Sequence, residues 1–241
     1  MKILFMGRKQ VSANLLRFLT KQDHIEIVGV LTDSHLQGSP TTAAAQELGL
    51  PLYTFDTALE AMREGRLKYD LGLSVLYWRK LRDEFLSIPT LGTINFHPAL
   101  LPEYKGTGGY NLAIMDELNE WGNTAHYVDA SIDTGEIIEV DRFPIDAETE
   151  TAQSLERKTM QALEDFARRI ITRAIESKTK LPTTPNIGGR YVSRDEMEAM
   201  KQIRDGDDVE KKIRAFWFPP YDGAYVKING QKYTLINRQL L

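Results

Sequence analysis

The sequence predicts an α/β protein whose mostly parallel β-sheet is flanked by helices on both faces. Short, continuously apolar segments alternate with segments whose apolar residues recur every three to four positions. This alternation is typical of parallel strands that are connected by helices. The 241 residues are 42% hydrophobic, enough for the core of one large domain with a small appendage.

The first half of the chain carries the parallel strands. Strand-like apolar segments lie at residues 2–7, 25–33, 51–55, 71–77 and 93–97. Helices are expected between and after them, at residues 11–23, 41–50, 58–65 and 108–118. In the second helix, Thr41 or Thr42 is the candidate N-cap and Gly49 the stop.

Two further strands and a long helix complete the main domain. The strands at residues 124–130 and 135–145 lie too close together for a helical crossover, so we expect an antiparallel edge. Residues 151–177 are expected to form one helix, because apolar side chains recur every three to four positions from Leu155 to Ile170. The main domain is therefore assigned to residues 1–180.

The composition changes near Leu181, where "LPTTPNIGG" predicts a linker into a small C-terminal region, residues 181–241. Residues 207–218 are helix-like, and residues 224–236 predict a β-hairpin with Asn229-Gly230 as a two-residue turn. Because a lone two-stranded hairpin is marginally stable in water, we expect it to pair with its counterpart in a homodimer.

Composition and charge limit the function. A net charge of −4 argues against nucleic-acid binding through overall charge. The absence of cysteine excludes a disulfide framework, a zinc–thiolate site and a cysteine nucleophile, and no metal site is predicted. No signal peptide and no apolar run of about 18–20 residues is present, so a cytoplasmic protein without a membrane segment is expected.

The first strand-to-helix turn contains a single glycine. Gly7 is followed by Arg8 and Lys9, so both the G-x-G-x-x-G dinucleotide fingerprint and the P-loop pattern are absent. NAD and FAD are therefore not expected. Arg8 and Lys9, beside a helix N-terminus, indicate either a phosphate site or a solvated basic turn.

Polar side chains gather where the strand at residues 93–97 ends. Strand alternation places Asn95 and His97 on one face, at the carboxyl edge where open α/β sheets bind ligands. Asp129 and Asp133 flank a later loop, either as turn residues or as a carboxylate that reaches His97. An imidazole oriented by a carboxylate and an amide that donates to an oxyanion are typical of acyl transfer. No serine or cysteine nucleophile motif accompanies them, so the nucleophile is expected to be the substrate, such as an amine.

Two motifs resemble the folate-dependent formyltransferase family. They are "NFHPALLPEYKG", which fits N-x-H-P-[SA]-x-L-P, and "HYVDASIDTG", which begins 29 residues after His97 and fits H-x-V-D-x-x-x-D-T-G. The resemblance covers residues 1–180 and, more loosely, the tail. It implies a Rossmann-like catalytic domain that uses N10-formyltetrahydrofolate as cosubstrate. It also implies that Asn95, His97 and Asp133 are the catalytic set.

The same resemblance implies the folate contacts. Backbone groups of the loop that contains Asp129, Ala130, Ser131 and Ile132 would bind the pterin ring. A second pterin-contact segment would consist of Arg79, Lys80 and Leu81, for which the alternative is a capped strand end. His126 lies in the second motif, where a structural role is the alternative for a histidine within a strand.

Within this family, "GGYN" and the tail "IRAFWFPPYDGAYVKINGQKYTL" are most similar to the sugar N-formyltransferases. These enzymes formylate the amine of a nucleotide-linked, here dTDP-linked, aminodideoxy sugar for lipopolysaccharide O-antigen biosynthesis, and are commonly dimers. Expected substrate contacts are Arg8, Lys9 and Lys105 to the diphosphate and Trp217 and Tyr221 to the base. The alternatives are exposed surface for the basic residues and tail packing for the aromatic residues.

Three other enzymes of this family and a non-catalytic protein fit the sequence less well. Glycinamide ribonucleotide transformylase has a more glycine-rich first turn. Methionyl-tRNA formyltransferase carries a full C-terminal barrel domain, and formyltetrahydrofolate hydrolase an N-terminal regulatory domain, for which this sequence leaves no room. A non-catalytic nucleotide-binding module would have no use for the set of Asn95, His97 and Asp133.

Overall fold

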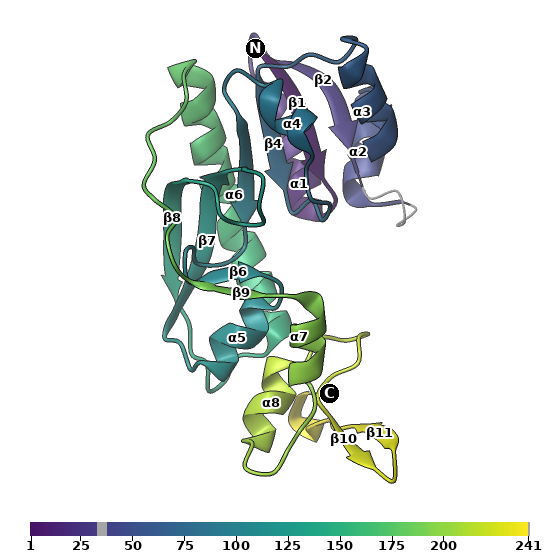
Figure 1. Ribbon diagram of the computed structural model, residues 1–241, viewed down its shortest axis with the longest axis vertical. Helices are drawn as coiled ribbons and strands as arrows, with labels where there is room; N and C mark the ends of the chain where they lie inside the picture. The colour runs from purple at the N-terminus through teal and green to yellow at the C-terminus, as the bar shows by residue number, and fades with distance from the viewer. Residues whose placement is uncertain (33–37, 241) are drawn as a thin grey trace.

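A computed structural model describes residues 1–32 and 38–240, and its centre is a seven-stranded sheet (Figure 1). The strand order is β3-β2-β1-β4-β5-β7-β8. The strands are β1 Lys2–Gly7, β2 Glu26–Leu31, β3 Leu52–Tyr53, β4 Leu71–Val75, β5 Thr93–His97, β7 Glu120–Tyr127 and β8 Ile137–Pro144. The strands from β3 to β5 pair in parallel, whereas β7 pairs antiparallel with both β5 and β8. The predicted mostly parallel sheet with an antiparallel edge is confirmed.

Helices cover both faces of the sheet. They are α1 Gln10–Leu19, α2 Pro40–Glu47, α3 Phe55–Arg63, α4 Asp83–Ser87, α5 Gly109–Met115 and α6 Ala152–Ser177. On β1, Ile3 and Phe5 pack in the core beneath α1, α2 and α6, whereas Leu4 and Met6 pack against α3 and α4. Each strand side chain therefore meets a helical layer, which explains the continuously apolar strands.

The long helix α6 follows its sequence pattern closely. Thr151 caps its N-terminus in a reciprocal arrangement with Ser154, and Lys178 ends it in a left-handed conformation. Its apolar face is buried against the sheet and consists of Leu155, Leu163, Phe166, Ala167, Ile170 and Ile171. Burial of such a face, rather than helix propensity, stabilises a helix of this length in a protein.

Some local predictions were wrong. The N-cap of α2 is Ser39, whose hydroxyl accepts from the Thr42 N–H, and Pro40 opens the helix. The third strand is only two residues long, because Thr54 caps α3 and the helix begins at Phe55. Asp33, the last residue of the predicted second strand, lies outside the described residues.

The C-terminal region forms a small layer at one end of the molecule (Figure 1). It contains β9 Arg190–Val192, α7 Arg194–Met200, α8 Val209–Ala215, β10 Tyr225–Ile228, β11 Gln231–Thr234 and the 3-10 helix η1 Arg238–Leu240. β9 pairs in parallel with the short β6, Tyr104–Gly106. Ile213 and Phe216 bury against Ile114 of α5, which anchors this layer to the main domain.

The predicted hairpin is confirmed as β10 and β11. Both turn residues have positive φ, 49° at Asn229 and 81° at Gly230, as a type I′ turn requires. Within the described part of the chain, no helix is long and apolar enough to cross a bilayer.

Candidate active site

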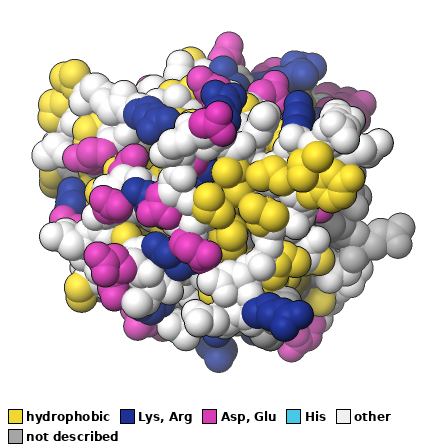
Figure 2. Space-filling view, turned by 90° about the horizontal axis from the view of Figure 1, so that it is seen from below, with side chains coloured by type: hydrophobic (Ala, Val, Ile, Leu, Met, Phe, Trp, Pro, Cys, Tyr) yellow, Lys and Arg dark blue, Asp and Glu magenta, His cyan; other side chains and the backbone are white. Residues whose placement is uncertain are grey.

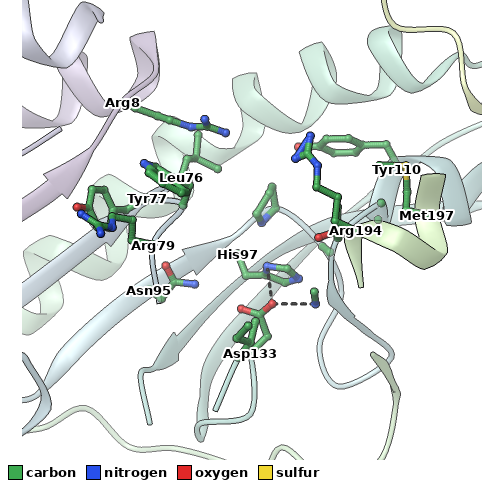
Figure 3. Close-up of a pocket in the computed structure, with 18 of the residues that line it drawn as sticks. Arg8, Leu76, Tyr77, Arg79, Asn95, His97, Tyr110, Asp133, Arg194 and Met197 are labelled. Atoms are coloured by element: carbon green, nitrogen blue, oxygen red, sulfur yellow. Dashed lines mark hydrogen bonds and ion pairs between the residues drawn. The ribbon is translucent and has the colours of Figure 1, made fainter. Parts of the chain in front are cut away.

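Two polar side chains of strand β5 lie at the carboxyl edge of the sheet. Ile94 and Phe96 point into the core, so Asn95 and His97 project from the opposite face, as strand alternation requires. Both side chains line one large pocket (Figure 3). The chain leaves the strand at Pro98 and enters a loop that turns back beside the histidine.

Both nitrogens of the His97 imidazole have protein partners. Nε2 lies 2.9 Å from the carbonyl oxygen of Tyr104, which can only accept, so Nε2 carries a proton. Nδ1 lies 3.6 Å from Oδ2 of Asp133. That contact is attractive when Nδ1 is also protonated, because the ring is then a cation beside a carboxylate.

Asp133 lies at the centre of the site and is nearly buried. Its Oδ2 accepts from the Gly106 N–H at 2.9 Å, which ties the catalytic loop after β5 to the loop between β7 and β8. Burial acts to raise the pKa of this carboxyl. The His97 and His126 rings and the Gly106 N–H together lower the pKa by more than burial raises it, so that it is about 2. The backbone of Asp133 has a φ of 55°, in a region that aspartate tolerates better than most residues.

His126, for which a structural role was the alternative from the sequence, lies in the same site. It lies on β7 directly opposite Asn95, and its Nε2 is 3.0 Å from Asn95 Nδ2 and 3.6 Å from Asp133 Oδ1. Its Nδ1 donates to the Tyr127 carbonyl, so in the neutral ring Nε2 accepts from the amide, whereas in the charged ring the Nε2–H faces the Asp133 carboxylate. In its neutral form His126 thus fixes the orientation of Asn95 and leaves the second N–H of the amide for the pocket. The pairing of β5 with β7 that brings these residues together was not predicted from the sequence.

The pocket has a volume of about 1240 Å³. It is lined by the two segments expected to bind the pterin. Arg79, Lys80 and Leu81 line it, as do Asp129, Ser131 and Ile132, whereas the exposed Ala130 does not. The Arg79 guanidinium lies 4.3 Å from the centre of the Phe55 ring, which holds this segment against α3.

Three of the five expected substrate residues also line the pocket. Arg8, Lys9 and Tyr221 do so, although the Lys9 ammonium also forms an ion pair with Glu156. Tyr221 is 70% exposed and forms a ring pair with Phe218. These side chains come from the first turn of the sheet and from the C-terminal region, which are far apart in the sequence.

Two substrate predictions are not supported. Lys105 is buried and does not line the pocket, because its ammonium donates to the Gly188 carbonyl at 2.7 Å. Trp217 also lies outside the pocket, and its carbonyl accepts from the N-terminus of α6. The sequence did not single out Tyr110, Arg194 and Phe218, which do line the pocket. Figure 3 shows Arg194 and Tyr110 across the pocket from Arg8.

Among the described residues, no group of three or more histidine, aspartate or glutamate side chains is arranged to hold a metal ion. The polar groups that converge here are two imidazoles, one carboxylate and one amide. Such a set can stabilise an oxyanion and move protons at a carbonyl centre.

Known proteins share this architecture. A family model described as formyl transferase matches residues 1–171. Methionyl-tRNA formyltransferase from Lysinibacillus sphaericus (strain C3-41) is 30% identical over 241 residues, covering 92% of this chain and 74% of the relative. The N-formyltransferase from Helicobacter canadensis, solved with folinic acid and dTDP-3-aminofucose, is 25% identical, with a TM-score of 0.75 over 96% of this chain and 86% of that one.

A 4-N formyltransferase from Francisella tularensis superposes with a TM-score of 0.80 over 98% of this chain and 96% of that one, at 20% identity, which establishes likeness of fold. The family model covers more than half of the chain, including both motif loops and all four polar site residues. The chain therefore belongs to the formyl transferase family.

Proposed function

We propose that this protein transfers the formyl group of N10-formyltetrahydrofolate to the amine of a nucleotide-linked aminodideoxy sugar. The observation that carries the proposal is that Asn95, His97 and Asp133 line one pocket together with two further sets of residues. One set belongs to loops suited to a pterin, and the other consists of basic and aromatic side chains suited to a nucleotide. The cosubstrate and the acceptor would therefore meet at the polar site residues.

The set suited to a pterin combines an apolar wall with accessible backbone. Leu81 is 7% exposed and forms part of the wall, on which a flat ring can pack. Ser131 and Ile132 lie on an exposed loop, whose peptide groups can pair with the polar edge of a pterin. The folinic acid bound by the Helicobacter canadensis relative supports a folate in this family member too.

The chemistry is an acyl transfer between two nitrogens. The neutral sugar amine attacks the formyl carbon, and the carbonyl oxygen becomes an oxyanion. The free N–H of Asn95 and the charged ring of His97 stabilise that oxyanion. The bond from carbon to N10 then breaks, the amine loses a proton and N10 gains one. The pair of His97 and Asp133 is suited to moving that proton, and the products are the formamide and tetrahydrofolate.

The set suited to a nucleotide favours a compact anion with an attached base. Arg8 and Arg194 line the pocket from opposite sides and supply positive charge suited to a phosphate-bearing ligand (Figure 3). Phe218 and Tyr221 form an aromatic pair, with centroids 5.9 Å apart, on which a pyrimidine can stack. The dTDP-3-aminofucose bound by the Helicobacter canadensis relative supports a dTDP-linked substrate. A role in O-antigen biosynthesis is proposed from the resemblance of the sequence to sugar N-formyltransferases.

Charged tRNA is a second candidate acceptor. It is favoured by the curated relatives, of which the Lysinibacillus sphaericus protein is a methionyl-tRNA formyltransferase. A net charge of −4 disfavours so large a polyanion.

Ligand-induced stabilisation tests this proposal before any substrate is synthesised. A ligand that binds only the folded protein raises the melting temperature by an amount that grows with the logarithm of its concentration over its dissociation constant. We expect 5-formyltetrahydrofolate and dTDP each to raise it, and NADH and initiator tRNA to leave it unchanged. Stabilisation by tRNA but not by dTDP would favour the second candidate, and stabilisation by NADH alone would contradict formyl transfer.

A further inference from the structure

Residues 183–192, here called the strap, lie across both loops that hold the catalytic residues. After α6 the chain runs alongside β8 and then crosses to lie beside β6 (Figure 1). Thr184 and Ile137 exchange backbone hydrogen bonds of 2.8 and 2.9 Å at the start of β8. This pairing fixes the first end of the strap directly beyond the loop that carries Asp133.

The other end of the strap holds the loop that follows His97. β9 pairs with β6, the Arg190 N–H donates to Glu103 O at 2.8 Å, and the Thr107 N–H donates to Val192 O at 2.8 Å. The buried Lys105 ammonium adds its bond to Gly188. The same loop supplies the Tyr104 carbonyl that accepts from His97, so the strap supports the histidine through this loop.

The backbone of the strap approaches the backbone of the loop after β5 closely, and this approach depends on Gly189. Gly189 has a φ of 80°, and a Cβ at this position would lie 1.5 Å from the carbonyl oxygen of Pro102. No side chain fits in that space. The strap and the catalytic loop are therefore in direct backbone contact.

Asn186 joins the strap to Asp133 itself. Its Nδ2 donates to the backbone carbonyl of Asp133 at 3.0 Å and to that of Gly135 at 2.9 Å. These bonds act on the residue whose positive φ aims the carboxylate at His97. We propose that Asn186 is a positioning residue that holds Asp133 in this conformation, and that the strap fixes the two catalytic loops relative to each other.

The physical reason lies in the backbone of Asp133. Although aspartate tolerates a positive φ better than most residues, this conformation is still less favourable than the ordinary ones, so contacts around Asp133 help to select it. Without the Asn186 amide, the carbonyls of Asp133 and Gly135 would lose their hydrogen-bond donor, and the loop that carries Asp133 could change conformation. The carboxylate would then shift relative to His97, and a displacement of about 1 Å at a reacting centre can cost on the order of a hundredfold in rate.

The decisive variants are Asn186→Ala, which removes the amide, and Asn186→Asp, which keeps its size but replaces the donor with an acceptor. The matched control is Thr183→Val, which removes a hydrogen bond between the same strap and the exposed Glu136 carboxylate. We expect both Asn186 variants to lower kcat by on the order of tenfold with dTDP-linked amino sugar, with KM for that sugar changed less than threefold. The control should match wild type, and all variants should melt within a few degrees of one another.

A second readout does not depend on the proposed reaction, although the inference rests on the role proposed for Asp133. The chain has four histidines, so the imidazole ¹⁵N signals of His97 can be resolved and assigned by substitution. The ¹⁵N chemical shifts of His97 should change in both Asn186 variants and should match those of wild type in Thr183→Val. Unmoved signals, or a kcat in the Asn186 variants within twofold of the control, would overturn the inference. Moved signals in a protein that does not formylate the sugar would support it and contradict only the proposed function.

Discussion

The His97 ring lies between two acceptors, the Tyr104 carbonyl and the Asp133 carboxylate, and this arrangement sets its role. A doubly protonated ring satisfies both, and asparagine in its place could neither carry the charge nor move a proton. His97→Asn should therefore lower kcat by on the order of a hundredfold or more, and Asn95→Ala by a similar factor through the missing oxyanion donor. Steady-state kinetics under saturating formyl donor measures both. Near-normal turnover in either variant, with an unchanged circular dichroism spectrum, would show that the assignment is wrong.

Asn95 depends on its neighbour across the strand pair. The His126 ring accepts from Asn95 Nδ2, so His126→Ala should free the amide to rotate and lower kcat by on the order of tenfold. Because the ring acts through Asn95, the double variant with Asn95→Ala should be no slower than Asn95→Ala alone. Additive losses would mean that His126 acts independently. His24→Asn, at an exposed histidine, is the control and should leave kcat unchanged.

Acid stability provides a test of Asp133 that needs no substrate. Its pKa in the folded protein is about 2, against 3.8 for the free side chain. A depressed carboxyl pKa stabilises the fold at pH values above the unfolded pKa, and this contribution is lost as the pH falls through the folded pKa. The difference corresponds to about 2 kcal/mol, and Asp133→Asn lacks this dependence.

The measurement is urea unfolding of both proteins as the pH falls from about 5 toward about 2. The advantage of the wild-type protein over Asp133→Asn should shrink by about 2 kcal/mol over that range. All other carboxylates contribute equally to both proteins, so they cancel in the difference. A constant difference would mean that Asp133 is not held by the two imidazoles.

At the scale of elements, the sequence predicted what hydrophobic periodicity and turn chemistry determine. Strand β1, helix α6 and the hairpin turn all follow directly from such patterns. The short elements α4, β6, β9 and α7 were not predicted, although α7 has a local signal in the capping box of Ser193 and Glu196. β6 is a strand only because β9, more than eighty residues later, pairs with it.

The same distinction applies to the site. Strand alternation and local motifs placed Asn95 and His97 correctly on one face of β5. The direction of a long side chain was not predictable, since Lys105 turns to a carbonyl of the linker rather than to the pocket. The contacts of Asn186 and His126 with the site were not predicted for a related reason. Their roles arise from the chain's return to Asp133 and from the pairing of β7 with β5.

The hairpin element carries a prediction about assembly. Ile228 and Tyr233 on this hairpin are each about half exposed, and Figure 2 shows hydrophobic side chains gathered on this end of the molecule. We propose that this face pairs with its counterpart in a homodimer, which would cover both apolar side chains. Ile228→Lys should place like charges across the symmetric interface and yield a monomer.

Sedimentation velocity at micromolar concentration measures this directly. The wild-type protein should sediment as two chains and Ile228→Lys as one, with Lys227→Ala on the other face of the hairpin as a control that stays dimeric. A variant that still sediments as two chains, or a monomeric wild type, would contradict the proposed interface.

At the scale of the whole molecule, the sheet and the C-terminal region each supply one part of the reaction site. The sheet edge provides the polar residues and the folate loops, and the C-terminal region provides Arg194, Phe218 and Tyr221. The strap connects the two parts through the catalytic loops. We therefore propose that acceptor choice depends on residues outside the family-matched segment, which ends at residue 171.

The most direct test of the central claim measures formyl transfer from N10-formyltetrahydrofolate to competing amines. The acceptors are a dTDP-linked 3-amino or 4-amino dideoxy sugar, glycinamide ribonucleotide and methionyl initiator tRNA. We predict turnover with the dTDP-sugar alone, and its loss by on the order of a hundredfold or more in His97→Asn. Formylation of the ribonucleotide or of the tRNA with a comparable kcat/KM would contradict the claim.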